Sequence, residues 1–292
     1  MRLAILGLGL IGGSLARALR ARRTEEELGI DAIAAWSPSG EGPAAAAREG
    51  VIDMAAASPE AAIEGSGLVV LAGPAPVCLA QLDDLAGSWR GALARDAVVT
   101  DVASTKSAIV LRATALGVRF VGGHPMAGRE TSGYSAASAD LFVGRPWVVV
   151  PTTDDGAVDA VEQLAAATGA IPRRMTATAH DEAVAAVSHL PLVLAAALVE
   201  TVAGGQIDRR DWPDAASLAA TGWRDMTRLA RGDVTMGAGI AATNAAPIAA
   251  RIRDLIAVLD GWLADLERRG GPDPDELAAR LRMARERLES MP

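Results

Sequence analysis

The sequence predicts a doubly wound parallel α/β sheet followed by an all-α domain. Short, uniformly apolar segments alternate with helical segments through residues 1–175, as buried parallel strands alternate with helices in α/β proteins. A glycine-rich turn follows the first of these apolar segments. Beyond about residue 176 the pattern indicates helices and no clear strand. We therefore predict two domains, residues 1–175 and 176–292.

The elements of the first domain follow from apolar runs bounded by turn residues. The expected strands are residues 3–7, 30–36, 51–54, 68–72, 97–102, 119–122, 146–150 and 170–175. The expected helices are residues 11–21, 44–49, 58–63, 77–86, 106–115 and 157–168.

The second domain is expected to carry a homodimer interface on its apolar helices. Residues 183–199 are apolar but contain Ser188, His189 and Pro191, whereas a membrane helix needs about 20 clean apolar residues. In residues 244–266 one helix face is apolar at spacings of three and four; it consists of Ile248, Ile252, Leu255, Leu259, Leu263 and Leu266. A charged last helix, residues 275–288, follows Pro272 and Pro274.

Composition narrows the class of protein. The chain has 292 residues, is 50% hydrophobic, and carries a net charge of −8 at pH 7. This hydrophobicity excludes intrinsic disorder, and the negative charge argues against a nucleic-acid partner. The single Cys78 excludes an internal disulfide framework and a cysteine-based zinc site, and indicates a reducing compartment, the cytoplasm. Glycines interrupt the apolar N-terminal segment, so we expect neither a signal peptide nor a membrane partner.

The glycine-rich turn predicts a Rossmann-like dinucleotide site. Its residues are Gly7, Leu8, Gly9, Leu10, Ile11 and Gly12, which read G-x-G-x-x-G between a strand and a helix. Such glycines allow a tight turn, a close approach of backbone to pyrophosphate, and close packing of the helix on the strand. A tight turn without ligand is the simpler alternative.

The ends of neighbouring strands are also expected to bind the dinucleotide, through Trp36, Ser37, Ala72 and Pro74. NAD-binding domains usually place an acid at the end of the second strand, but here Trp36 and Ser37 stand there. Serines at 37 and 39 slightly favour NADP over NAD.

His124 is the expected general base. It lies between glycines in a predicted loop directly after a strand, where α/β sheets bind ligands, and an imidazole suits removal of a hydroxyl proton. Ser104 follows another strand and could orient this histidine or touch the nicotinamide, or simply cap a helix. For His180 a capping or interdomain contact is favoured, and His189 reads equally as a core histidine. No metal-ligand spacing occurs, so we expect no metal.

With these motifs in place, the chain resembles the prephenate/arogenate dehydrogenase family of tyrosine biosynthesis from end to end. The shared segments are GLGLIGGS (7–14), DVASTK (101–106), GGHPMAGRETSG (122–133), SHLP (188–191) and WRDMTRLA (223–230), and the histidine loop with Glu130 and Gly133 is the most specific. The resemblance implies a Rossmann-like domain, an α-helical dimerisation domain, and NAD(P)-dependent oxidative decarboxylation of a cyclohexadienol.

The resemblance also implies roles for single residues. His124 would accept the proton of the ring C4 hydroxyl, and Ser104 would orient it. Arg228 would bind a substrate carboxylate, with Asp225 in its charge network and Ser188 at the substrate. From its residue type alone Arg228 would read as a solvated charge.

Two departures concern the choice between prephenate and arogenate. Many prephenate-active members carry a second histidine after SHLP, where this chain has Leu192, and a tryptophan where it has Gly237. Residues 236–244 are more similar to arogenate-using, NADP-linked relatives.

Alternative functions stay open at this point. One is a dehydrogenase of a 4-amino-4-deoxyprephenate-type analogue, and another is a non-catalytic, cofactor-sensing dimer. A hydroxy-acid dehydrogenase generally relies on a lysine in its helical domain, and residues 176–292 contain none.

Overall fold

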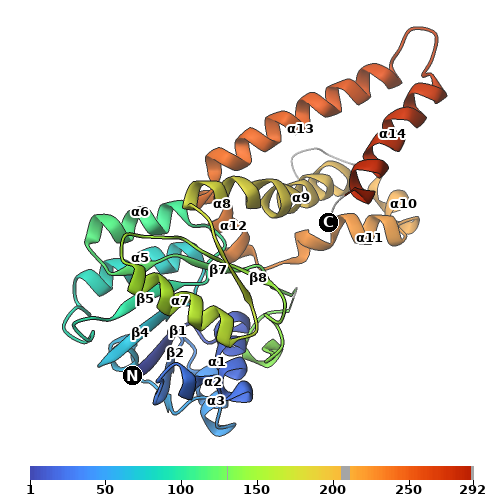
Figure 1. Ribbon diagram of the computed structural model, residues 1–292. Coiled ribbons are helices and arrows are strands. Elements are labelled where there is room, and N and C mark those ends of the chain that lie inside the picture. The colour runs from blue at the N-terminus through green and yellow to red at the C-terminus, as the bar shows by residue number, and fades with distance from the viewer. Residues whose placement is uncertain (130, 205–210, 291–292) are drawn as a thin grey trace. The chain divides into compact units, whose positions relative to one another are not determined.

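The computed structural model describes residues 1–129, 131–204 and 211–290 (Figure 1). It contains two compact units, Met1–Ala245 and Ala246–Pro292. The first unit extends well past residue 175, because the helices that follow are tied to the strand ends by hydrogen bonds. The backbone N–H groups of Lys106 and Ser107 both donate to Asp181, and the Thr105 and Thr243 hydroxyls lie 2.8 Å apart.

Six parallel strands form the main sheet in the order β3-β2-β1-β4-β5-β6. They are β1 (Arg2–Leu6), β2 (Ala32–Trp36), β3 (Met54–Ala55), β4 (Ser66–Leu71), β5 (Val98–Asp101) and β6 (Phe120–Val121). This is the strand order of a doubly wound Rossmann sheet, whose ligands bind beyond the carboxyl ends of the strands. The predicted fold class is confirmed.

Both faces of this sheet are buried, which explains its uniformly apolar strands. On one face Leu3 and Ile5 pack in a core with α1 (Leu10–Arg22), α3 (Glu41–Arg48) and α7 (Asp155–Ala167). On the other, Ala4 and Leu6 pack with three further helices, α4 (Pro59–Ile63), α5 (Ala75–Ala86) and α6 (Ser107–Leu116). The short α2 (Thr24–Glu27) follows α1. Strand alternation thus sends neighbouring residues into opposite cores.

The remaining strands form a separate sheet, which differs from the single sheet predicted. They are β7 (Gly123–Pro125), β8 (Pro146–Val149) and β9 (Ile171–Arg174), with β7–β8 antiparallel and β8–β9 parallel. The chain leaves β6 at Gly122 and pairs at once with β8, where His124 faces Val148. A side chain at Gly123 would meet the Asp101 carbonyl oxygen at 2.6 Å, so only glycine fits this crossing. The prediction of a loop at His124 is therefore wrong, since His124 lies on a strand.

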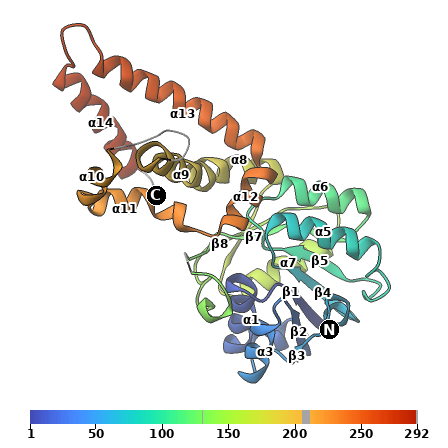
Figure 2. The same ribbon diagram turned by 180° about the vertical axis from the view of Figure 1, so that it is seen from behind.

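Every described element after β9 is helical. In the first unit these are α8 (Ala177–Val184), a π-helical turn (Ala185–His189), α9 (Leu190–Ala203), α10 (Trp212–Ser217), α11 (Thr221–Thr227), a 3₁₀ turn (Arg228–Arg231) and α12 (Val234–Thr243). Figure 2 shows the run from α8 to α9 from behind. This run, Ala177–Ala203, has the length and apolar composition of a membrane-crossing helix, a property that core helices of soluble proteins share.

The second unit is a helical hairpin of α13 (Ala245–Leu266) and α14 (Pro274–Glu289). Arg280 of α14 lies over the Trp262 ring at 4.5 Å and pairs with Asp265 at 2.6 Å, so the two helices are held side by side. Large apolar side chains are nevertheless exposed on both helices, among them Leu259 and Leu263, each about half exposed.

Candidate active site

The glycine turn between β1 and α1 is packed at two positions and open at one. Gly7 has φ +112°, and a side chain there would meet the Ala72 carbonyl oxygen at 2.7 Å. A side chain at Gly12 would overlap the Gly7 carbonyl oxygen, whereas one at Gly9 would meet nothing within 4 Å. The open space at Gly9 faces the N-terminus of α1, where backbone N–H groups and the helix dipole favour phosphate.

A cavity of about 930 Å³ runs along this turn and the ends of β1, β2 and β4. Seven of the predicted cofactor residues line it, namely Gly7, Leu8, Gly9, Trp36, Ser37, Ala72 and Pro74. Leu10, Ile11 and Gly12 form the first turn of α1 instead. The cavity also contains residues that the motif did not indicate, including Gln81, Asp84 and Trp89. Its size and its glycine cradle fit a dinucleotide.

The segment after β7 is anchored against the cofactor helix by Tyr134, which the sequence did not single out. Tyr134 begins a 3₁₀ turn (Tyr134–Ala136), and a side chain at Gly13 would meet its ring at 2.7 Å. Its hydroxyl donates to Glu49 at 2.8 Å, and Arg17 lies over its ring at 4.6 Å. Burial and this carboxylate raise the pKa of Tyr134 to about 12. The tyrosine is thus a fixed, neutral wall of the cavity.

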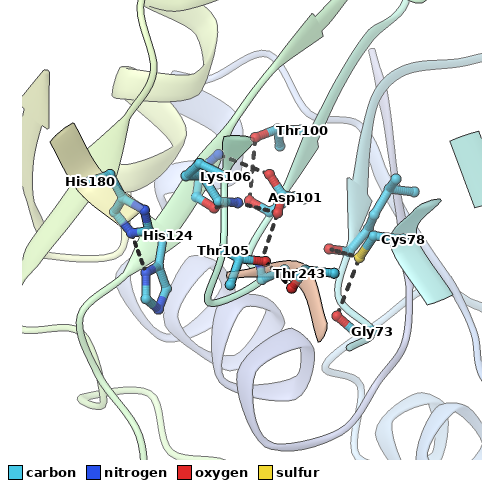
Figure 3. Close-up of polar contacts among 12 residues, drawn as sticks. Gly73, Cys78, Thr100, Asp101, Thr105, Lys106, His124, His180 and Thr243 are labelled. Carbon is cyan, nitrogen blue, oxygen red and sulfur yellow. Dashed lines mark hydrogen bonds and ion pairs between the residues drawn. The ribbon is translucent and has the colours of Figure 1, made fainter. Parts of the chain in front are cut away.

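His124 belongs to a chain of three polar side chains. Its Nδ1 lies 2.8 Å from Nε2 of His180 (Figure 3), and Nδ1 of His180 lies 2.8 Å from the Asp181 carboxylate. Sequence reasoning favours a capping or interdomain contact for His180. The structure places it at the start of the helical region, directly behind His124. The adjacent His-Asp pair was the only sequence signal for this role.

This chain fixes which nitrogen of each ring carries a proton. The Asp181 carboxylate accepts hydrogen bonds from the backbone N–H groups of Lys106 and Ser107. Because an ionised carboxylate can only accept, His180 Nδ1 must donate to it as well. His180 Nε2 is then left to accept from His124 Nδ1, which leaves a lone pair on His124 Nε2. That atom has no hydrogen-bond partner within residues 1–129, 131–204 and 211–290. His124 is thus arranged to accept a proton.

The surroundings of His124 and Asp181 lower the pKa values of both groups. Burial lowers the pKa of His124 well below its usual value of 6.5, and the neighbouring His180 and Lys106 lower it further. Burial opposes ionisation of Asp181, but hydrogen bonds from His180 and Ser107 outweigh it and lower the Asp181 pKa to about 2. At neutral pH His124 is therefore an uncharged base, and Asp181 is a carboxylate that orients it through His180.

A buried ion pair holds the strand that carries His124. Lys106 is fully buried, and its ammonium group contacts the Asp101 carboxylate and donates to the Gly123 carbonyl oxygen at 2.6 Å. Asp101 in turn accepts from the Gly123 and Ala103 N–H groups. These bonds join the end of β5 to β7 one residue before His124. The DVASTK segment thus supplies the clamp as well as Ser104.

The other predicted site residues make no hydrogen bond to His124, His180 or Asp181 among the described residues. Ser104 is half-buried in the loop between β5 and α6, which follows the same sheet edge as the glycine turn. Ser188 is exposed in the π-helical turn, and Arg228 and Asp225 are exposed at the end of α11 and the turn after it. These three stand outside the hydrogen-bonded chain of His124, His180 and Asp181. Glu130 lies outside the described residues.

His189 and Asn244 form a second buried pair. The Asn244 side-chain amide donates to the Asp181 carbonyl oxygen at 2.8 Å and lies 3.0 Å from His189 Nδ1. Burial lowers the His189 pKa to about 4, which keeps the ring neutral at physiological pH. The pair joins the π-helical turn and the end of α12 to the backbone of Asp181. It therefore supports the His124 chain from behind.

The two positions at which the sequence departs from prephenate-active members are neighbours. A side chain at Gly237 would lie 3.6 Å from Leu192 Cδ2, in ordinary van der Waals contact. The small residue on α12 and the leucine on α9 thus shape one place in the helical region.

Comparisons with known proteins agree with this architecture. Residues 15–172 match the family model described as prephenate dehydrogenase, nucleotide-binding domain, and residues 176–282 match that of the prephenate dehydrogenase dimerization domain. The prephenate dehydrogenase of Bacillus subtilis is 34% identical over 262 residues, which are 88% of this chain and 67% of the relative.

Two solved structures are similar over nearly the whole chain. Synechocystis arogenate dehydrogenase is 30% identical with a TM-score of 0.77, covering 99% of this chain and 100% of the other. Prephenate dehydrogenase from A. aeolicus, solved in complex with hydroxyphenyl propionate and NAD+, is 28% identical with a TM-score of 0.84, covering 99% and 98%. From its sheet order, glycine cradle and matched domains, this chain belongs to the prephenate dehydrogenase family.

Proposed function

We propose that the chain is an NAD(P)-dependent dehydrogenase that oxidatively decarboxylates prephenate or arogenate to 4-hydroxyphenylpyruvate or tyrosine. The observation that carries this proposal is the oriented lone pair of His124 Nε2, behind which His180 and Asp181 are aligned. The glycine turn and the Asp101–Lys106 and Gly122–His124 segments all follow carboxyl ends of strands in one parallel sheet. Cofactor and base are therefore on the same sheet edge.

The reaction asks few things of the protein. His124 accepts the proton of the C4 hydroxyl as the C4–H bond breaks and a C4 carbonyl forms. A nicotinamide dinucleotide held along the glycine turn, Trp36 and Ser37 would supply the hydride acceptor for C4. Cleavage of the bond between the ring and its carboxylate then releases carbon dioxide. Its electron pair restores an aromatic ring, and the C4 oxygen takes up a proton to become the phenol hydroxyl. The protein mainly holds C4 in position and accepts one proton at Nε2 of His124.

The remaining site residues have proposed roles of their own. Ser104 would orient His124 or contact the substrate, since its loop ends at the Lys106 clamp. Arg228 would bind a substrate carboxylate, with Asp225 and Ser188 near it. All three are exposed on this chain, so substrate binding would cover them. We assign dinucleotide binding to residues 1–175, and both substrate binding and dimerisation to residues 176–292.

The neighbouring Leu192 and Gly237 favour arogenate over prephenate in this proposal. Leu192 stands beside Gly237, which has no side chain, at the place where, by the resemblance, many prephenate-active members carry a histidine and a tryptophan. Such a place lacks the donors that would select a keto-acid side chain.

The cofactor is a nicotinamide dinucleotide, and a preference for NADP belongs to the proposal. Ser37 and Ser39 line the cavity at the end of β2 and offer hydroxyl groups to a 2′-phosphate. Glu41 lines the same place and opposes a second negative charge. Replacing Glu41 by Gln should therefore raise the use of NADP relative to NAD.

The apolar helices are proposed to pair with those of a second copy. The domain match, the exposed leucines of α13 and the partly exposed apolar run of α8 and α9 support this. Three residues of that run make hydrogen bonds within the first unit: His180 with His124, Asp181 with the Lys106 backbone, and His189 with Asn244. A protein interface explains such a helix better than a bilayer does.

Initial rates of reduced-nicotinamide formation test the function, with prephenate and arogenate each paired with NAD and NADP. Activity with arogenate, best with NADP, is the expected result. Activity with prephenate and NAD alone would overturn the proposed preferences and keep the reaction. Silence in all four combinations would overturn the reaction itself.

A further inference from the structure

One end of the dinucleotide cavity is built from a single face of α5. Val77, Ala80, Gln81 and Asp84 all line it, at the spacings of three, four and seven that place residues on one side of a helix. Pro59 and the tryptophans Trp36 and Trp89 line the cavity as well. The glycine turn takes the pyrophosphate and the end of β2 takes the adenosine ribose in such folds. The α5 face therefore lies where the base would be.

Gln81 is the unusual residue on that face. Its side chain is only 6% exposed, and its amide oxygen Oε1 is buried without a hydrogen-bond partner among the described residues. On the same helix Cys78, Leu82 and Leu85 pack in the core, so Gln81 stands at the border between core and cavity. A buried amide without a partner is destabilising. A ligand in the cavity is a partner that this amide could bind.

We propose that Gln81 recognises the adenine base of the dinucleotide. An amide pairs with adenine through two bonds, its oxygen accepting from the 6-amino group while its nitrogen donates to N7. On the same edge a 6-oxo purine presents two acceptors, so the amide can make only one of the two bonds. The tryptophans and Val77 supply apolar and aromatic surface for the faces of the base. Gln81 is then the group that selects a 6-amino purine. This inference rests on the proposed function only in requiring an adenine dinucleotide as cofactor.

Equilibrium binding without substrate tests the proposal. The probes are NAD and deamino-NAD, in which a 6-oxo group replaces the 6-amino group, and binding is followed by calorimetry or tryptophan fluorescence. Should the 2′-phosphorylated forms bind more tightly, the corresponding pair replaces them. The native protein is expected to bind the adenine form roughly tenfold more tightly, as a site with a positioned acceptor does.

Three variants separate recognition from folding. Gln81→Met keeps the length of the side chain and removes both hydrogen-bonding groups, so the affinity ratio should fall to about one. Gln81→Glu keeps an acceptor for the 6-amino group and should retain the preference. Asp83→Asn, on the same helix but exposed outside the cavity, is the matched control and should leave the ratio unchanged.

Each other outcome overturns the inference. A ratio near one in the native protein would contradict it, as would a Gln81→Met variant that keeps the native ratio or weakens both dinucleotides equally. Dinucleotide binding without base preference would leave the proposed dehydrogenase standing. Failure of both dinucleotides to bind would remove the proposed function together with this inference.

Discussion

The two ring nitrogens of His124 have separate tasks. Nδ1 donates a hydrogen bond to His180. This bond fixes the orientation of the ring and leaves Nε2 as the acceptor. Burial and neighbouring positive charge lower the pKa of His124, so the base is already uncharged at neutral pH. In the proposed reaction, His124 would therefore need no prior deprotonation, only a substrate hydroxyl within hydrogen-bonding reach.

The pH profile should report this pKa. Because a protonated His124 cannot accept a proton, kcat/KM should hold from neutral pH through 6.5 and fall only below it. In His180→Gln the ring that lowers the pKa of His124 is gone, so the acid limb should move up towards 6.5. Loss of the orienting bond should also lower kcat by about ten- to a hundredfold. Initial rates between pH 5 and 8 check both effects; an unmoved limb would contradict the assignment of His180.

Arg228 should act on substrate affinity. Replacing it by Ala should raise KM about tenfold or more with little change in kcat, because a charged hydrogen bond to a carboxylate contributes to binding. Arg231, on the same turn, is the matched control. Equal KM values for Arg228→Ala and the native enzyme would remove it from the substrate site.

At the level of elements, the turn between β1 and α1 serves folding and binding through different glycines. Gly12→Ala forces its side chain onto the Gly7 carbonyl oxygen and should lower the free energy of unfolding by about 1–3 kcal/mol. Gly9→Ala meets open space in the protein and should leave stability nearly unchanged. It should still weaken dinucleotide binding about tenfold or more, since its methyl group enters the space for pyrophosphate. Thermal unfolding and titration of the two variants distinguish these roles.

The sequence predicted the elements whose signals are local. The strands of the main sheet are apolar runs between turns, and the glycine motif marks β1 and α1 directly. β7 carried no such signal, because a strand of three residues containing glycine and proline has no periodicity to detect. Its pairing with β8 is decided by tertiary contacts at Gly123.

The candidate site was predictable only in part for a similar reason. His124 stood out by its glycine neighbours, but His180 is 56 positions away in sequence and belongs to a helix. Its meeting with His124 depends on how α8 docks through Asp181 onto the start of α6. Gln81 was equally hidden, since a single polar residue on an apolar helix face shows its burial only in the folded chain.

For the whole molecule, the exposed apolar side chains of the helical hairpin predict association. Leu263→Asp on α13 should convert a dimer into a monomer, because a charge would be buried at the interface. Leu111→Asp is the control, since Leu111 is 72% exposed on α6 of the dinucleotide-binding region. Light scattering at micromolar concentration measures both. A native protein that is monomeric there would contradict the proposed dimer.

The most direct measurement compares His124→Asn with the native enzyme, recording turnover with the preferred substrate and dinucleotide affinity on the same preparation. Asparagine keeps a polar group on β7 and removes the base. We predict that kcat falls by about 10² to 10⁴-fold while the dinucleotide Kd stays within about twofold. Native kcat in this variant would show that another group accepts the proton, and would contradict the central role of His124.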